Sequence, residues 1–459
     1  MSMPGHITHS ASFRDPSGFV FLKKGIVYRQ VNHSYAADYE LLMQSGLYQR
    51  LTEEKLLIPH SEVDENLTGS PHWYKTLLPL QLFFISYAYE WSFAQLKEAA
   101  DLTLKILEIA IAYGMCLKDA NSFNIQFHEG ALILIDTLSF EKYDASRPWV
   151  AYRQFCESLL FPLYLSHYLK TDLQKWLIVY PEGIPVALIS RILPAKSRLS
   201  LGSWLHVYLQ NRIRSDNPVG NKPVSFTREK MQTLTRHLRS EVSRMTLSGV
   251  AISSWSNYYD ETILGGGYLH EKEIIFRTFL EGIDFGSALD IGANNGYFSK
   301  ILAGTGKNVI AMDSDHQCID SLYRSVRRNN DRTIIPLCVD IANPSPAIGF
   351  RNTERQSLIQ RVRADLVTAL AITHHLALGK NIPLEGIAGL MADLTNSYLI
   401  VEYVPLTDKM AQQLIKNKSQ YHSPYDEPTF ENSFRHYFVI EQKSRIPGTE
   451  RVLYRMRKC

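Results

Sequence analysis

Short apolar runs that end at or beside a polar residue recur through the second half of the chain, with helical patterns between them. The five runs are Ser287–Asp290, Lys307–Asp313, Thr333–Asp340, Ala364–Ala371 and Ser397–Glu402. Regular alternation of strands and helices predicts a parallel sheet with helices on both faces. Ligands bind at the carboxyl ends of such strands, so we expect Asp290, Asp313 and Asp340 to gather at one edge.

The first half of the chain combines strand patterns with one long helical pattern. Residues Phe19–Val31 predict a β-hairpin around Gly25, and residues Phe93–Tyr113 predict a helix. We interpret the apolar run Leu82–Trp91, just before that helix, as a strand. Ala131–Asp136 is a further apolar strand that ends in an acid. The first half is therefore expected to be an α+β domain.

A stretch rich in turn-forming residues separates the two halves. It spans Ser215–Pro223 and is followed by an amphipathic helical pattern over Thr227–Leu247. A chain of 459 residues suits two or three domains. We predict a first domain over residues 1–215, a linker with an amphipathic helix over 216–250, and a second domain over 251–459.

Composition excludes several broad classes of protein. The hydrophobic content of 45% and the net charge of +3 suit a globular protein and give no concentrated basic stripe for nucleic acid. The densest basic cluster is interpreted as a solvated helix face; it comprises Arg324, Arg327, Arg328 and Arg332. The most apolar stretch, Leu77–Phe93, is too short and polar to span a bilayer. Scattered cysteines and the lack of a signal pattern predict a cytoplasmic protein.

The turn after the first apolar run of the second half contains the clearest candidate chemistry. It begins at Asp290 and includes Gly292, Asn294 and Gly296, so the backbone can approach a ligand closely. Asp313 follows about twenty residues after Asp290, the spacing at which a Rossmann-like unit places a carboxylate on ribose hydroxyls. A nicotinamide-binding domain is the rival interpretation, but this turn lacks its Gly-x-Gly-x-x-Gly pattern.

These residues resemble the class I S-adenosylmethionine-dependent methyltransferases. The resemblance runs from about Trp255 to the C-terminus and implies a Rossmann-like, seven-stranded methyltransferase sheet, with runs His436–Gln442 and Arg451–Arg457 as its terminal hairpin. It implies that the Asp290–Gly296 loop holds the methionine part of S-adenosylmethionine, Asp313 the ribose and Asp340 the adenine amino group. Additions before the sheet cap the pocket in this family. The resemblance therefore implies that the substrate side of the pocket is lined by Trp255, Tyr258 and Tyr259. Alternatively, these residues only pack a helix onto the sheet.

Two adjacent histidines, His374 and His375, follow the fourth strand, where the family places groups that contact the methyl acceptor. A histidine can accept a proton near neutral pH, so one of them is a candidate base, while at least one is expected to be a buried, hydrogen-bonded core residue. Glu402 and Asp408 flank the loop after the fifth strand and are candidates to shape the acceptor site. An Asn/Asp-Pro-Pro-Tyr motif is absent, which disfavours adenine or glutamine nitrogen as the acceptor.

A second candidate site lies in the first half. Asp119, Asn124 and Asp136 resemble the catalytic loop and metal-binding strand of the protein-kinase-like and aminoglycoside-phosphotransferase-like families. The resemblance implies a two-lobed kinase-like domain in which Asp119 is the base and Asn124 and Asp136 hold Mg²⁺ on ATP. A glycine-rich phosphate loop is absent, and the phosphate-pairing cation is open among Lys23, Lys24, Arg29 and Lys75. Alternatively, the three polar residues cap turns and satisfy loop N–H groups.

Together these features predict a multidomain α/β enzyme that methylates an oxygen or nitrogen acceptor. Because kinase-like and methyltransferase domains are joined in some chain-capping enzymes, a bacterial glycan or another small metabolite is the expected substrate. The kinase-like domain would bind nucleotide or substrate, or would phosphorylate the same substrate in a bifunctional enzyme. A binding or regulatory protein with two degenerate sites is the other alternative. An RNA methyltransferase is disfavoured by the mild charge.

Overall fold

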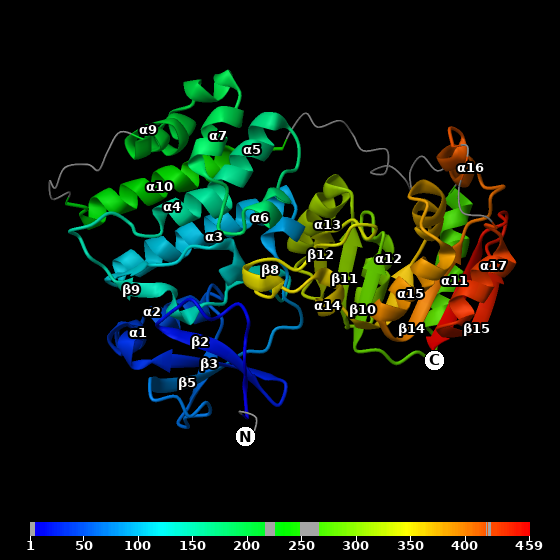
Figure 1. The fold of residues 1–459 in the computed structure, drawn as a ribbon, viewed down its shortest axis with the longest axis horizontal. Coiled ribbons are helices and arrows are strands. Elements are labelled where there is room, and N and C mark those ends of the chain that lie inside the picture. Colours follow the sequence, from blue (N-terminus) through cyan, green and yellow to red (C-terminus); the bar gives the residue numbers. More distant parts are fainter. Residues whose placement is uncertain (1–4, 216–224, 248–265, 419, 421–423) are drawn as a thin grey trace. The chain divides into compact units, whose positions relative to one another are not determined.

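The computed structural model describes residues 5–215, 225–247, 266–418, 420 and 424–459 (Figure 1). The chain forms two compact units. Unit 1 comprises residues 1–250 together with 347–356, and unit 2 comprises residues 251–346 and 357–459. The short segment 347–356 therefore interrupts the sequence of unit 2 but belongs to unit 1.

Unit 1 begins with a five-stranded antiparallel sheet in the order β1-β2-β3-β5-β4. The strands are β1 (Ile7–Thr8), β2 (Gly18–Lys23), β3 (Ile26–Asn32), β4 (His60–Val63) and β5 (Trp73–Pro79). The predicted hairpin around Gly25 is confirmed: Lys23 pairs with Ile26, and the two turn residues have positive φ, 52° at Lys24 and 78° at Gly25. Such turns match the twist of the flanking strands.

Between β3 and β4 the chain forms the helices α1 (Ala36–Gln44) and α2 (Leu47–Glu53). The predicted strand over Leu82–Trp91 is wrong, because this segment contains only a short 3₁₀ turn, Ala88–Glu90. At its centre, the backbone of Ser86 is paired with a side chain instead of a neighbouring strand: the Ser86 N–H donates to Gln126 Oε1 at 2.8 Å, and Gln126 Nε2 donates to the Ser86 carbonyl at 2.9 Å. Buried irregular backbone needs such partners, and an apolar pattern does not reveal them.

The rest of unit 1 is built on the long helix α3 (Phe93–Ala112), as predicted. Ser92 and Gln95 form a capping box at its start. Two short antiparallel strand pairs follow, and then a group of helices. The hairpin of β7 (Ile125–His128) and β8 (Ala131–Leu134) lies in the sequence between the paired strands β6 (Met115–Leu117) and β9 (Phe140–Lys142). The helices include α4 (Tyr152–Phe155), α5 (Phe161–Leu169), α6 (Trp176–Val179), α7 (Val186–Ile192), α8 (Leu201–Ser203) and α9 (Gln210–Ser215).

The predicted amphipathic helix after residue 223 is confirmed as α10 (Arg228–Arg244). It packs on α3 within unit 1. Arg239 of α10 forms ion pairs with two residues of α3, Asp101 at 2.9 Å and Glu108 at 3.0 Å. The helix is thus an integral part of unit 1.

Unit 2 is a seven-stranded sheet in the order β12-β11-β10-β13-β14-β16-β15 (Figure 1). The strands are β10 (Ser287–Ile291), β11 (Asn308–Asp313), β12 (Ile334–Cys338), β13 (Ala364–Ala369), β14 (Thr395–Tyr403), β15 (Phe438–Arg445) and β16 (Val452–Lys458). The first five pair in parallel, and β16 runs antiparallel to both β14 and β15. The five predicted parallel strands and the terminal hairpin are confirmed, with ends shifted by a few residues.

Helices alternate with these strands, as the βα pattern predicts. They are α11 (Gly266–Leu280), α12 (Tyr297–Ala303), α13 (His316–Asn329), α14 (Leu358–Arg361), α15 (Leu384–Leu394), α16 (Lys409–Ile415) and α17 (Glu427–Arg435). Helix α13 buries Ile319, Leu322 and Val326. Its exposed face carries Arg324, Arg327 and Arg328 of the basic cluster, whereas Arg332 is exposed after the end of the helix. All five cysteines are free thiols. In the described part of the chain, no helix has both the length and the apolar character needed to cross a membrane.

Candidate functional site

The loop between β10 and α12 lies at the carboxyl edge of the parallel sheet of unit 2. The N–H groups of Gly292 and Ala293 donate to the carbonyl of Met312, at 2.8 and 2.9 Å, which fixes the loop to the end of β11. Gly296 has a φ of 79°, and a Cβ there would lie 2.4 Å from Leu322 Cδ1. Glycine is therefore required at Gly296 both for the backbone conformation and for the packing of α13 beneath the loop.

Asp290 lies beneath this loop and is only 2% exposed. Its carboxylate accepts hydrogen bonds from Ser299 Oγ at 2.6 Å and from Thr368 Oγ1 at 2.7 Å. Burial raises the pKa of Asp290, and the two hydroxyl donors partly oppose that rise. These contacts join β10, α12 and β13, so the carboxylate supports the loop from below.

Asp313 and Asp340 follow the neighbouring strands β11 and β12. The Asp313 carboxylate accepts the N–H groups of Asn294 and Asp315, each at 2.8 Å. Burial raises the pKa of Asp313, although these two backbone donors lower it. A carboxylate has about four acceptor positions, so two backbone donors leave others for a ligand. Asp340 is half-buried and accepts the N–H of Ala342 at 2.9 Å.

The two histidines begin the turn after β13. His374 is fully buried, and neither of its ring nitrogens has a hydrogen-bond partner among the described residues. Its ring centroid lies 4.2 Å from that of His375. Burial lowers the pKa of both side chains, to about 4 at His375, so both rings are neutral at pH 7. The expectation that the buried histidine is hydrogen-bonded is wrong for His374.

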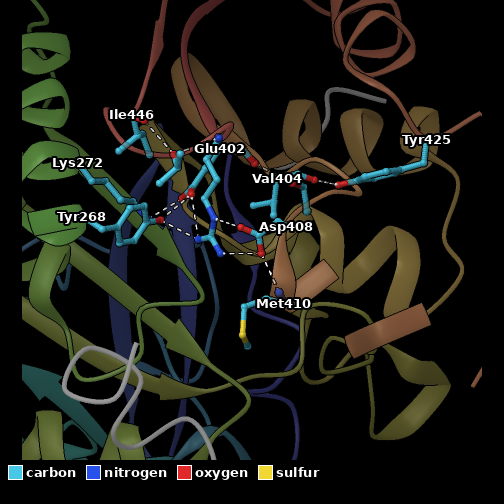
Figure 2. A network of polar contacts seen from close by, with 11 residues as sticks. Tyr268, Lys272, Glu402, Val404, Asp408, Met410, Tyr425 and Ile446 are labelled. Atoms are coloured by element: carbon cyan, nitrogen blue, oxygen red, sulfur yellow. Dashed lines mark hydrogen bonds and ion pairs between the residues drawn. The ribbon is translucent and has the colours of Figure 1, made fainter. Parts of the chain in front are cut away.

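A network of buried charges lies next to these residues (Figure 2). Glu402, on β14, pairs with Lys272 of α11 at 2.6 Å and with Arg451 Nη1 at 3.4 Å. Tyr268 donates its hydroxyl to Glu402 at 2.8 Å and accepts Arg451 Nη1 at 2.8 Å. Arg451 also donates two hydrogen bonds to the Asp408 carboxylate, from Nε at 2.8 Å and from Nη2 at 3.1 Å.

The network contains two cations, Lys272 and Arg451, and two carboxylates, Glu402 and Asp408, so its net charge is zero. Each of the four side chains is at most 7% exposed. Burial alone would raise the pKa of Glu402, but Lys272 and Arg451 together hold it below its usual value. Glu402 and Asp408, predicted to shape the acceptor site, are thus held by internal cations that sequence reasoning missed. Trp255, Tyr258 and Tyr259 lie outside the described residues.

Asp119, Asn124 and Asp136 lie close together in unit 1. Asn124 Nδ2 donates to Asp136 Oδ2 at 3.4 Å, and burial followed by the charge of Asp136 raises the pKa of Asp119. Asp119 also accepts the N–H of Asn121 at 3.0 Å, and Asp136 accepts that of Leu138 at 2.9 Å. The two carboxylates therefore cap turns and face each other across Asn124.

Arg29 is the candidate cation that reaches this cluster. Its Nη2 lies 2.7 Å from Asp136 Oδ1, and both side chains are nearly buried. Lys75 instead pairs with Glu62 at 2.8 Å. Within the described ranges, no group of three or more His, Cys, Asp or Glu side chains is placed to hold a metal ion. Any metal here would depend on Asp119, Asp136 and the amide oxygen of Asn124.

No protein-family model matches the chain. Nodulation protein NoeA of Rhizobium meliloti (strain 1021) is 29% identical over 464 residues, which cover 98% of this chain and 96% of NoeA. Among solved structures, N-methyltransferase NodS from Bradyrhizobium japonicum WM9 is 14% identical, with a TM-score of 0.31 over 42% of this chain and 96% of NodS. The bifunctional kinase-methyltransferase WbdD is 16% identical, with a TM-score of 0.29 over 45% of this chain and 40% of that one.

Proposed function

We propose that unit 2 is an S-adenosylmethionine-dependent methyltransferase domain. The observation that carries this proposal is the position of Asp313, at the end of β11, where its carboxylate holds the Asn294 N–H of the glycine loop. The strand order, with its single antiparallel strand β16, suits the same domain class. The carboxyl edge of the sheet is where folds of this kind bind nucleotides.

The residues at this edge fit the parts of that cofactor. Asp313 has acceptor positions left for the two ribose hydroxyls, and Asp340 can accept from the amino group of the base. The cofactor supplies a methyl group on a positively charged sulfur. Asp290 keeps the loop in place through Ser299 and Thr368.

We propose that His374 contacts the substrate group that accepts the methyl group. A buried imidazole with two unpaired nitrogens is unfavourable unless a ligand completes its hydrogen bonds. As a neutral ring, His374 can accept a hydrogen bond from an acceptor hydroxyl or amine and orient it toward the methyl group. His375, half-buried beside it, is the alternative for the same role.

The substrate class that we propose is a bacterial glycan or another small metabolite with an oxygen or nitrogen acceptor. The similarity to nodulation protein NoeA extends over nearly the whole chain. This supports a nodulation-related role that involves both units.

Isothermal titration calorimetry with S-adenosylmethionine tests the cofactor assignment. We expect the full chain to bind it, and Asp313→Asn to weaken binding by about tenfold or more, since hydrogen bonds to a charged group contribute roughly 1.5–3 kcal/mol. Asp320→Asn is the matched control, because Asp320 lies on the nearby helix α13 and pairs with Arg324 at 2.7 Å. Absence of binding to the unaltered chain would rule the proposal out.

We propose, as a second function, that unit 1 binds a nucleotide with Mg²⁺. The supporting observation is the convergence of Asp119, Asn124 and Asp136, with Arg29 paired to Asp136 at 2.7 Å. Two carboxylates and an amide are suitable ligands for Mg²⁺, and a buried arginine can stabilise phosphate charge. The bound nucleotide could serve in two ways at this site. It could donate a phosphoryl group, as in a bifunctional kinase-methyltransferase, or it could only organise the unit.

Titration with ATP in the presence and absence of Mg²⁺ tests this second function. We expect magnesium-dependent binding that Asp136→Asn removes. Asp144→Asn is the control, because Asp144 is exposed and caps a turn at Ser146 in the same unit. ATP binding that needs no Mg²⁺ and is unchanged in Asp136→Asn would favour a regulatory unit with a degenerate site.

A further inference from the structure

Residues 347–356 form a small hairpin that belongs to unit 1 although the sequence on both sides belongs to unit 2. Ile348 and Arg355 exchange both backbone hydrogen bonds, at 3.0 and 3.1 Å. The turn contains two non-glycine residues with positive φ, 57° at Arg351 and 56° at Asn352. Such angles are uncommon for residues other than glycine and are typical of tight turns.

Two neighbouring residues of unit 1 hold the hairpin in place. Arg14, which precedes β2, binds Glu354 at 2.7 Å and also binds Glu182 at 2.6 Å. The Phe13 and Phe350 rings lie 5.9 Å apart. The hairpin is therefore attached to the segment that precedes β2.

These contacts place Arg355 against the loop that carries the candidate nucleotide site. Its guanidinium lies 4.3 Å from the centroid of the Phe123 ring, and Phe123 directly precedes Asn124. The Tyr87 and Tyr89 ring centroids lie 5.7 and 6.2 Å from the Phe123 centroid. Arg355 thus lies over an aromatic platform one residue from a proposed metal ligand.

No carboxylate of the described residues forms an ion pair with Arg355, although the Glu354 carboxylate favours its charge from a greater distance. Its Nη1 donates to the Glu354 carbonyl at 3.2 Å, while the Glu354 carboxylate binds Arg14 instead. Burial lowers the pKa of Arg355, although the side chain remains charged at neutral pH because arginine titrates far above it. A half-buried cation without a carboxylate partner is unfavourable unless a ligand supplies the missing charge.

We propose that Arg355 binds a phosphate group of the ligand held beside Asn124, so that the hairpin completes the phosphate site of unit 1. This inference rests on the proposed nucleotide site. A guanidinium stacked on an aromatic ring keeps its N–H edge free, and that edge matches a phosphate in a two-point contact. The hairpin would supply a cation in a unit whose sequence lacks a glycine-rich phosphate loop.

The test compares three probes on the full chain: ATP with Mg²⁺, pyrophosphate with Mg²⁺, and adenosine. We expect Arg355→Gln to weaken ATP and pyrophosphate by about tenfold or more and to leave adenosine unchanged, since it removes only the charged hydrogen bonds. Arg355→Lys should recover part of the loss. Arg351→Gln is the matched control, because Arg351 lies in the same hairpin and is exposed. Thermal melting checks that each variant folds.

The possible outcomes separate this inference from the proposed function. Equal affinities for Arg355→Gln and Arg351→Gln would overturn the role of Arg355 and leave the nucleotide site intact. Binding of pyrophosphate but not ATP, lost in Arg355→Gln, would support the anion site and contradict the nucleotide function. Binding of neither ligand by the unaltered chain would overturn both proposals.

Discussion

Replacing Glu402 by glutamine should strongly destabilise unit 2. The change keeps the shape of the side chain but removes the charge that faces Lys272 at 2.6 Å and Arg451 at 3.4 Å, at a site with no exposure. At an effective dielectric constant of about 20, one pair of charges about 4 Å apart contributes roughly 4 kcal/mol. Breaking a buried ion pair by removing one partner costs about 3–5 kcal/mol. We therefore expect a loss of about 3–5 kcal/mol.

The assay is urea unfolding followed by hydrogen exchange and peptide mass spectrometry, because peptides from residues 266–346 and 357–459 report on unit 2 alone. Glu441→Gln is the matched control: Glu441 also pairs with two arginines, Arg455 at 3.1 Å and Arg457 at 2.8 Å, but near the surface. Glu441→Gln should lower the stability of unit 2 by less than about 1 kcal/mol. Adding Lys272→Met to Glu402→Gln should restore part of the lost stability. Equal effects of the two glutamine variants would refute the reasoning.

Three further predictions concern a turn glycine, a buried histidine and the substrate class. Gly296→Ala should cost about 1–3 kcal/mol more than Gly306→Ala in the same unfolding assay, because both glycines have φ near 79° but only the Cβ at residue 296 would meet Leu322. The lowered pKa of His375 means that the unfolded chain binds the proton first, so this residue should destabilise unit 2 by about 1.4 kcal/mol per pH unit as the pH falls from 6.5 to about 4. His374, whose pKa is also lowered, acts in the same direction, so His375→Gln should reduce the pH dependence without abolishing it; an unchanged slope would contradict the contribution of His375. A strain without the gene should lack one methyl group on a glycan or small metabolite, detected by comparative mass spectrometry; an unchanged profile would argue against that substrate class.

The sheet of unit 2 could be predicted from the sequence because its strands are buried on both faces. Such strands appear as continuous apolar runs, and the acids at their ends mark the ligand-binding edge. Asp313 and Asp340 were found in this way at the ends of neighbouring strands. The segment Leu82–Trp91 has the same apolar character but forms no strand; the backbone of Ser86, at its centre, is paired with the Gln126 side chain, 40 positions away in the sequence. Local patterns carry no sign of such a partner.

The buried charge network could not be predicted for a related reason. Lys272 lies in a helix and Arg451 in the turn before β16, positions where charged residues are usually exposed. Their partners Glu402 and Asp408 were noticed only as flanks of a loop. Only the fold brings these four residues and Tyr268 together; 183 positions of the sequence separate Tyr268 from its partner Arg451. The position of Arg355 in unit 1 was equally hidden, because its hairpin interrupts the sequence of the other unit.

The central claim is that the carboxyl edge of the unit 2 sheet holds S-adenosylmethionine. The most direct test is ultraviolet cross-linking of methyl-labelled S-adenosylmethionine to the full chain, followed by mapping of the labelled peptides. We predict label in peptides that contain the Asp290–Gly296 loop, Asp313 or Asp340, and loss of that label when S-adenosylhomocysteine competes. Label confined to other peptides, or label that S-adenosylhomocysteine does not displace, would contradict the claim.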